Sequence, residues 1–464
     1  MRVALDSWMR ISDHLLSISS LTPTLEEVEA MHFTSTADPS VKVTASEAMS
    51  RGLAPGGRLF VPSEFPTFSP GDFDGLETMA EIGAHLLRPF FEGDPLQERL
   101  LEICEEAFDF PIPLEELTDD TSVLELFHGP TAAFKDIGAR FLASCLSRIN
   151  EGHERPLTIL VATSGDTGGA VAAAFHGKPN VEVFILYPKG RVSHRQERQL
   201  TCWEGNITTY AVDGFFDDCQ KMVKAAFAHD WWKENKRLSS ANSINIGRLL
   251  PQMVYYAASS LWHWRTHDHD APSYIVPSGN VGNVCACVWA RACGLPIDEV
   301  ILATNANATL GEYFTTGNWE PRPTIETIAN AMDVGNPSNM ERLRYLWPTV
   351  EQMREHLRVE QVMDPQIRTQ IKLGERVWGE VWCPHTACAV QVREGIADDR
   401  HWIMVATAHP AKFDIIVEPL VGHPIEVPEE LAKLLEKPNL SIEIEADLEA
   451  LTEAVAAHSG AIPS

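Results

Sequence analysis

The fold is decided by Leu157-Thr-Ile-Leu-Val-Ala-Thr-Ser-Gly-Asp-Thr-Gly168. Its first six residues form an apolar run with the length of a buried strand, and the glycine-containing part then turns into a small-residue helix through Phe175. The same order follows downstream, with strands expected at 181–187 and 207–212 and helices at 193–201 and 216–228. Alternating strands and helices predict a parallel α/β sheet with right-handed crossovers.

The alternating pattern returns later in the chain. A strand at 274–276 leads through a loop into a helix that ends near Cys293, and a further strand is expected at 300–304. In front of the sheet, a short helix at 45–51 and a strand or hairpin at 56–62 indicate a small leading domain, which helical patterns at 75–90 and 95–107 continue. Residues 320–380 are more helical.

Bulk composition limits the classes of partner. The 464 residues include 37 Lys and Arg against 65 Asp and Glu, so the net charge is −28. Such a chain repels nucleic acid and anionic membranes, and an anionic ligand requires a concentrated local site. The nine cysteines include no CxxC pair, and no apolar run approaches the ~18 residues of a membrane span. We expect reduced thiols and a cytoplasmic location, with no nucleic-acid or membrane partner.

One lysine stands out as a candidate nucleophile. Lys135 lies in Leu126-Phe-His-Gly-Pro-Thr-Ala-Ala-Phe-Lys-Asp-Ile-Gly-Ala-Arg140, next to Phe134 and just before a helical pattern. An amine on an apolar surface is easier to deprotonate, because desolvation disfavours the ammonium form, and a neutral amine can attack an aldehyde. The alternative is a lysine in the first turn of a surface helix.

Two glycine-containing loops follow strands, at Thr163–Gly168 and at Pro277-Ser-Gly-Asn-Val-Gly-Asn283. Open α/β sheets bind ligands beyond the carboxyl ends of their strands, where both loops belong. Glycine lets the backbone approach a ligand, and the following helix N-terminus offers free N–H groups to an anion. Either loop alone is equally consistent with a plain strand-to-helix turn, and neither fits a dinucleotide GxGxxG or a P-loop.

Three further groups of polar residues are weaker candidates. His263, His267 and His269 with Asp268 and Asp270 resemble a metal cluster, but they lie in a polar stretch after a helix, and we interpret them as a solvated loop without metal. Cations concentrate at Lys189, Arg191, Arg195 and Arg198, as an anion site or a solvated helix face. Asn242 and Ser243 with Arg248 form a second possible anion site, or a helix cap with an exposed arginine.

Taken in order, these pieces resemble the threonine synthase family, pyridoxal-phosphate (PLP) enzymes of the tryptophan-synthase β-like group, fold type II. The resemblance rests on the ordered stretches Leu126–Thr131 with Phe134-Lys-Asp136, Thr163–Gly168, Tyr187-Pro-Lys-Gly190, Ser240-Ala-Asn-Ser-Ile-Asn245, Pro277-Ser-Gly-Asn280, Ala331-Met-Asp333, Pro384-His-Thr386 and Ala406-Thr-Ala-His-Pro-Ala-Lys-Phe413. It covers the chain from Met31 to about residue 430.

The resemblance implies two open α/β lobes plus a small N-terminal domain. The expected parts are an extension at 1–30, the leading domain at 31–118, a PLP-binding region at 119–430 with a smaller lobe at about 152–240, and an acidic C-terminal tail at 431–464. We hypothesise that translation starts at Met31, which N-terminal sequencing of the native protein tests. A monomer or homodimer is expected.

The resemblance also implies roles for residues around the cofactor. Lys135 would carry PLP covalently, and the loop Gly279, Asn280, Val281, Gly282 and Asn283 would hold the cofactor phosphate through backbone N–H groups. Thr407 would hydrogen-bond the ring nitrogen, and Asp166 would lie near the phenolic oxygen. The sequence departs from the family at Ala132, Val281 and Asn283, where leucine, phenylalanine and aspartate are common, which affects the shape around the ring.

The implied substrate is O-phospho-L-homoserine, a small phosphorylated anion. Thr163, Ser164 and Thr167 would receive its carboxylate, and the substrate phosphate would contact Lys189, Asn242, Ser243 and Arg248. The implied reaction gives L-threonine and phosphate. Two alternatives stay open: a threonine-synthase-like phospho-lyase that releases 2-oxobutyrate, and a non-catalytic PLP-binding relative, although that relative would be expected to lose the lysine or the phosphate loop.

Overall fold

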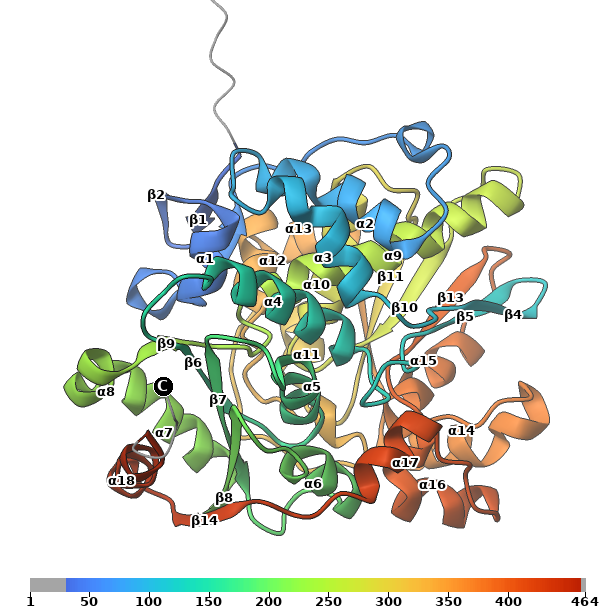
Figure 1. Cartoon of the computed structure of the whole chain (residues 1–464). Helices are drawn as coiled ribbons and strands as arrows, with labels where there is room; N and C mark the ends of the chain where they lie inside the picture. The colour runs from blue at the N-terminus through green and yellow to red at the C-terminus, as the bar shows by residue number, and fades with distance from the viewer. Residues whose placement is uncertain (1–30, 460–464) are drawn as a thin grey trace, which may run out of the picture. The chain divides into compact units, whose positions relative to one another are not determined.

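Three sheets organise residues 31–459, the part of the chain that the computed structural model describes (Figure 1). The expected extension at residues 1–30 lies outside the described residues, so the hypothesis that translation starts at Met31 stays a prediction. The leading domain holds β1 (Phe33–Ser35), β2 (Asp38–Val43), α1 (Ala45–Arg51), β3 (Phe60–Pro62), α2 (Met79–Leu87) and α3 (Leu100–Ala107). Its small antiparallel sheet has the order β2-β1-β3.

The larger lobe is built on a six-stranded sheet. Its order is β12 (Arg358–Gln361), β11 (Val300–Thr304), β10 (Ser273–Pro277), β13 (Trp402–Ala406), β5 (Thr121–Glu125) and β4 (Leu114–Thr118). Neighbouring strands are parallel except for the hairpin of β4 with β5 at one edge. The central strands are buried along their whole length, as expected for parallel strands covered on both faces.

The smaller lobe contains a five-stranded parallel sheet, in which β9 and β14 join the three strands that the sequence predicts. Its order is β14 (Ile442–Glu445), β8 (Ile207–Asp213), β7 (Val181–Pro188), β6 (Leu157–Ala162) and β9 (Arg237–Ser239). The crossovers are made by α5 (Asp166–Phe175), α6 (His194–Thr201), α7 (Phe216–Ala228) and α8 (Asp230–Asn235). The two strand–helix patterns in the sequence therefore belong to two separate sheets, which confirms the two α/β lobes.

The acidic tail expected after residue 430 is, over its described residues, a folded part of the smaller lobe and ends in a docked helix. After α17 (Glu429–Leu435), β14 adds to the edge of β8 in parallel register, and α18 (Leu448–Ser459) packs on α7. Leu451 and Val455 are fully buried in the same apolar cluster as Met222 of α7. The acidic composition describes only the exposed face of this helix, while its apolar face completes the core.

Long helices connect the leading domain to the lobes. α4 (Lys135–Ile149) packs against α3, α5 and α9 (Ile246–Thr266), and α9 also contacts α2 and α10 (Gly282–Ala292). The remaining helices are α11 (Thr309–Thr316), α12 (Met340–Leu346), α13 (Val350–His356), α14 (Asp364–Val377), α15 (Pro384–Glu394) and α16 (Asp414–Val421). Among these described residues, no helix combines the length and the apolar character that crossing a bilayer requires.

Arg342 of α12 ties the leading domain to the larger lobe. Its guanidinium is fully buried and donates to the carbonyl oxygens of Phe60 in β3, 3.0 Å away, and of Ile244, 2.7 Å away. It also donates to the side chain of Asn339 at 2.5 Å. Burial lowers the pKa of Arg342 to about 10, which still leaves it charged at neutral pH.

Candidate active site

The candidate nucleophile Lys135 is the first residue of α4, at the end of a loop fixed to the central sheet. The N–H of Leu126 donates to the carbonyl of Ala406 at 3.0 Å, and the N–H of Phe134 donates to the carbonyl of Thr407 at 2.9 Å. Because β13 ends at Ala406, these bonds place Lys135 at the carboxyl edge of the sheet. This is the edge at which open α/β proteins bind ligands.

The environment of Lys135 favours its neutral amine. The side chain is 15% exposed, and its Nζ lies 5.9 Å from the centre of the Phe134 ring. Burial lowers the pKa of Lys135, while the carboxylate of Asp166, 3.8 Å away, opposes this shift. The net lowering makes more of the nucleophilic amine available at a given pH than an exposed lysine offers.

Asp166 forms a buried ion pair with a lysine that the sequence analysis did not assign to the site. Lys412 has no exposed side-chain surface, and its Nζ lies 3.0 Å from Oδ1 of Asp166 and 2.6 Å from the carbonyl of Thr131. Burial alone would raise the pKa of Asp166, but the ammonium groups of Lys412 and Lys135 hold that pKa well below its usual range. Asp166 is therefore held as an anion, with Lys412 as its nearest cation. Lys412 lies in the Ala406–Phe413 motif, although nothing in that motif indicates its burial.

The loop from Gly279 to Asn283 has the form of an anion-binding cradle. A Cβ at Gly279 would lie 2.5 Å from backbone atoms of Met332, so the chain is close to its neighbour there. Val281 precedes α10 in the left-handed region, with φ of 64°, and no side chain among the described residues caps that helix. A β-branched residue in this region is strained and indicates a functional constraint, and an uncapped helix start presents free N–H groups.

Several buried polar atoms near this loop have no hydrogen-bond partner within residues 31–459. They are Oδ1 of Asn242, Nε of Arg248 and Nδ2 of Asn283. Buried polar atoms normally form hydrogen bonds. The three unpaired atoms belong to residues of the predicted anion-binding segments, so they indicate a place for a ligand. Arg248 is fully charged at neutral pH even though burial lowers its pKa to about 10.

The two predicted anion-binding segments are joined directly. Nδ2 of Asn280 donates to Oγ of Ser243 at 2.6 Å, and the carbonyl of Asn280 accepts from Asn339 at 3.0 Å. Asn283 is held from the other side, because its Oδ1 accepts from the hydroxyls of Tyr255 and Tyr256 of α9. The structure thus brings the loop before α9 and the loop before α10 together.

The loop after β6 is shaped by Thr163. The hydroxyl of Thr163 accepts from the N–H groups of Gly165 and Gly168, at 3.0 and 2.9 Å, and donates to the carbonyl of Gly165 at 3.2 Å. This leaves the hydroxyl committed to the turn, while Ser164 and Thr167 are half-buried. The expected carboxylate contact of Thr163 remains a prediction, and the observed bonds give this residue a shaping role.

Lys189 is exposed and pairs elsewhere. It follows β7, and its Nζ lies 2.6 Å from the carboxylate of Glu443 in β14. The bond belongs to the edge of the smaller sheet that the C-terminal segment completes. The predicted contact of Lys189 with a substrate phosphate stays untested, and it would require this ion pair to open.

The histidine-rich stretch differs from the sequence interpretation. His263 is not in a solvated loop but inside α9, with a 1% exposed side chain, because it faces the core where this helix crosses the sheet. His267 lies at the end of the helix against His263, whereas His269 is exposed. The interpretation as a solvated loop is correct only for residues after His267.

Comparison with family models covers nearly the whole described chain. The family model described as "Pyridoxal-phosphate dependent enzyme" matches residues 113–407. The model of the "Threonine synthase N terminus" matches 32–108, and the model "Threonine synthase, C-terminal" matches 386–455. The chain belongs to the threonine synthase family. Family membership confirms the resemblance that the ordered motifs indicated, and the C-terminal match includes β14 and most of α18.

Individual members of the threonine synthase family agree over the full length. Threonine synthase from Escherichia coli (strain K12) is 39% identical over 431 residues, which span 91% of this chain and 98% of that enzyme. Its crystal structure gives a TM-score of 0.83 and covers 92% of this chain and 99% of its own. The PLP-bound threonine synthase from Brucella melitensis is 32% identical, with a TM-score of 0.86, and covers 93% of this chain and all of its own.

Proposed function

We propose that this protein is a PLP-dependent threonine synthase that converts O-phospho-L-homoserine and water into L-threonine and phosphate. The observation that carries the proposal is the position of Lys135. Its amine is desolvated, lies 3.8 Å from a carboxylate held by Lys412, and is fixed to the backbone of Thr407 through the preceding residue. This environment favours attack of the amine on an aldehyde, and relatives similar over nearly the whole chain are named threonine synthase.

The residues present fit PLP. Lys135 would hold the cofactor covalently, the cradle Gly279–Asn283 would receive its phosphate, and Thr407 would face its ring nitrogen. The unpaired Nδ2 of Asn283, the uncapped start of α10 and the close backbone approach at Gly279 are the structural features that support this fit. When bound, PLP supplies an electron sink for charge that develops on carbon atoms of an amino-acid substrate.

The chain's own residues supply binding and proton transfer. Arg248 is a buried cation with a free Nε, and Asn242 and Ser243 lie on the same segment, so they support recognition of the substrate phosphate by charge-assisted hydrogen bonds. Lys135 would take and return protons at Cα and the neighbouring carbons, because its lowered pKa makes the neutral amine more available as a general base. The helix starts at Asp166 and Gly282 present backbone N–H groups beyond the carboxyl ends of β6 and β10.

The buried ion pair of Asp166 and Lys412 would hold the charged groups beside Lys135 in fixed positions. Asp166 stays anionic and so keeps Lys412 and Lys135 in place, which preorganises the site before the substrate binds. Water must reach Cβ only after phosphate leaves Cγ. Closure of the two lobes over the substrate would control this order.

The test is incubation of the PLP-loaded protein with O-phospho-L-homoserine, with phosphate and the carbon product quantified together. Lys135→Ala is compared with Lys221→Ala, a matched control at an ion-paired position that is 76% exposed. Threonine formed in step with phosphate by the wild type and the control, and absent in Lys135→Ala, supports the proposal. Phosphate with 2-oxobutyrate would instead assign the phospho-lyase reaction, and no phosphate release would contradict the substrate assignment.

A further inference from the structure

Three histidines meet at the edge of the central sheet opposite the candidate active site. His263 lies in the last turns of α9, His267 follows that helix, and His401 directly precedes β13. The ring centres are 3.9 Å apart for His263 and His267, 4.2 Å for His263 and His401, and 5.1 Å for His267 and His401. One ring nitrogen from each residue lies within 4.8 Å of the others.

The buried member of this cluster has nothing to bond. Both ring nitrogens of His263 are buried and lack a hydrogen-bond partner among residues 31–459. A neutral imidazole carries one hydrogen-bond donor and one acceptor. Burying it without partners for these atoms costs free energy of folding. The neighbouring imidazoles stack on it rather than accept from it, so packing alone leaves its polar atoms unsatisfied.

The other two histidines are anchored in the way that metal-binding histidines commonly are. Nδ1 of His267 lies 3.3 Å from the carbonyl of His263, and the ring of His401 is hydrogen-bonded to the backbone of Asp119. A ring nitrogen that donates to a backbone carbonyl leaves the opposite nitrogen as a lone-pair donor. The Nε2 atom of His401 lies 2.8 Å from the hydroxyl of Ser122. That hydroxyl can rotate away and leave Nε2 for a metal ion.

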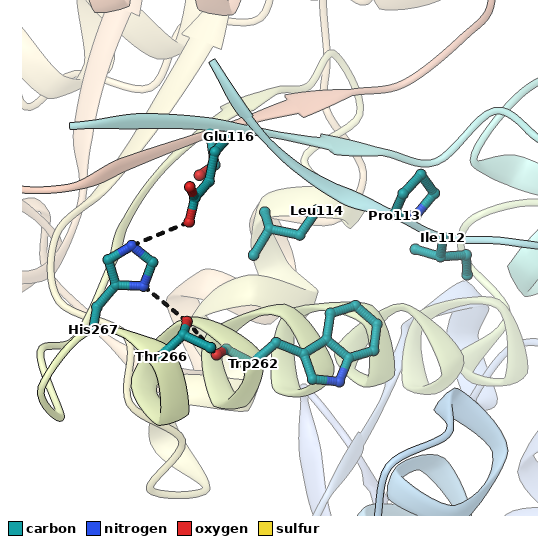
Figure 2. A pocket seen from close by; sticks show the side chains of 8 residues that line it. Ile112, Pro113, Leu114, Glu116, Trp262, Thr266 and His267 are labelled. Atoms are coloured by element: carbon teal, nitrogen blue, oxygen red, sulfur yellow. Dashed lines mark hydrogen bonds and ion pairs between the residues drawn. The ribbon is translucent and has the colours of Figure 1, made fainter. Parts of the chain in front are cut away.

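A carboxylate and an entry path lie beside the cluster. Oε1 of Glu116 in β4 is 3.3 Å from Nε2 of His267, and its side chain is 67% exposed (Figure 2). The same residues border a cavity of about 470 Å³, which is also lined by Ser122 and Trp262. A small ion can therefore reach the histidines from this side, and Glu116 can supply a fourth ligand.

Negative groups face the cluster from β4 and its turn. They are the carboxylates of Glu116 and Asp120, whose charges favour a cation.

We propose that His263, His267 and His401, with Glu116, form a binding site for a divalent transition-metal ion of the Zn²⁺ type. Three imidazoles and one carboxylate are ligands that Zn²⁺ accepts in tetrahedral sites, and the hard cations Mg²⁺ and Ca²⁺ prefer oxygen. Bound metal would join the end of α9 to β4 and to the start of β13. The site would lie about 20 Å from Thr407, given six residues of extended chain at roughly 3.3 Å each, so its role is structural rather than chemical.

The test measures Zn²⁺ binding to the chelator-treated, PLP-loaded protein by calorimetry, together with metal content after equilibrium dialysis. His267→Gln removes a half-buried ligand, and His269→Gln is the matched control, since it removes an exposed histidine from the same loop. We expect one Zn²⁺ per chain, an affinity at least about tenfold weaker in His267→Gln and unchanged in His269→Gln, and a higher thermal midpoint with Zn²⁺ only where the site is intact.

Glu116→Gln provides a second variant whose exposed position leaves folding intact. An affinity reduced in both His267→Gln and Glu116→Gln, with phosphate release from O-phospho-L-homoserine unchanged, supports the site. Absence of stoichiometric Zn²⁺ in the wild type would overturn the proposal. Binding that survives in His267→Gln with wild-type affinity would also overturn it, because the ion would then be bound elsewhere.

Discussion

Replacement of Lys412 by methionine tests whether the ion pair with Asp166 organises the active site. Methionine keeps the length and apolar stem of the side chain but leaves Asp166, which is 4% exposed, without its 3.0 Å partner. Removing one member of a buried pair costs about 3–5 kcal/mol, because the remaining charge is uncompensated. We therefore expect Lys412→Met to lose about that much free energy of unfolding at pH 7, measured by urea unfolding of the PLP-loaded protein.

A second substitution separates the charge from the packing. In Lys412→Met with Asp166→Asn, the neutral amide no longer needs a cation, so the double variant should recover about 1–3 kcal/mol relative to Lys412→Met. Lys433→Met is the control, since that lysine is 55% exposed and should change stability by less than about 0.5 kcal/mol. Strictly additive effects of the two substitutions would refute the coupling.

The pH dependence has a defined sign. The pKa of Asp166 is lower in the folded protein than the ordinary aspartate value of 3.8, so its stabilisation is fully present above about pH 4 and is lost as the pH falls through the lowered folded pKa. The stability difference between wild type and Lys412→Met should therefore be largest at neutral pH and shrink below pH 4. A difference that grows towards acid pH would contradict this assignment.

Three further predictions concern the site. Gly279→Ala should weaken PLP binding at least about tenfold in a fluorescence titration, because its Cβ would meet a backbone at 2.5 Å, whereas Gly311→Ala, with open space around it, should not. Arg248→Met should raise KM for O-phospho-L-homoserine about ten- to a hundredfold, because charged hydrogen bonds contribute about 1.5–3 kcal/mol, and an unchanged KM would exclude a phosphate contact. In the cofactor-free protein, amine labelling of Lys135 should titrate below the usual lysine pKa, and Asp166→Asn should lower that pKa further, since the carboxylate opposes the shift; a rise would reverse the assigned sign.

Local patterns predicted the elements that are set by nearby residues. The run 157–162 and the helix at 45–51 have the predicted bounds, because apolar length and the Thr44 capping box act within a few residues. The strand β13 was not predicted from the sequence, although Trp402–Ala406 is fully buried at the centre of the larger sheet. The segment after residue 430 could be predicted only as an acidic helix-forming tail, because its charge is visible in the sequence and its buried stripe is visible only against α7.

In the site, too, residues within one motif could be predicted, whereas residues that meet only in the fold could not. Lys135 and the loop at 279–283 carry their chemistry in adjacent residues, so the sequence indicates them. Lys412 becomes a site residue only because the chain after β13 turns back towards Thr131. His401 is likewise remote from His263 in sequence, and they meet because β13 is inserted between β10 and β5. No spacing rule encodes such strand order.

The buried guanidinium of Arg342 has a consequence for protein engineering. It donates to a carbonyl of β3 and to the side chain of Asn339, and Asn339 in turn donates to the carbonyl of Asn280 in the proposed cofactor cradle. A strand of the leading domain and the loop before α10 are therefore two ends of one chain of hydrogen bonds. A leading domain taken from another protein would have to present a carbonyl at the position of Phe60. Without it, the loop before α10 would be held less firmly, although the leading domain makes no direct hydrogen bond to it in this chain of contacts. The leading domain and α12 are in this sense one interchangeable part, to be designed together.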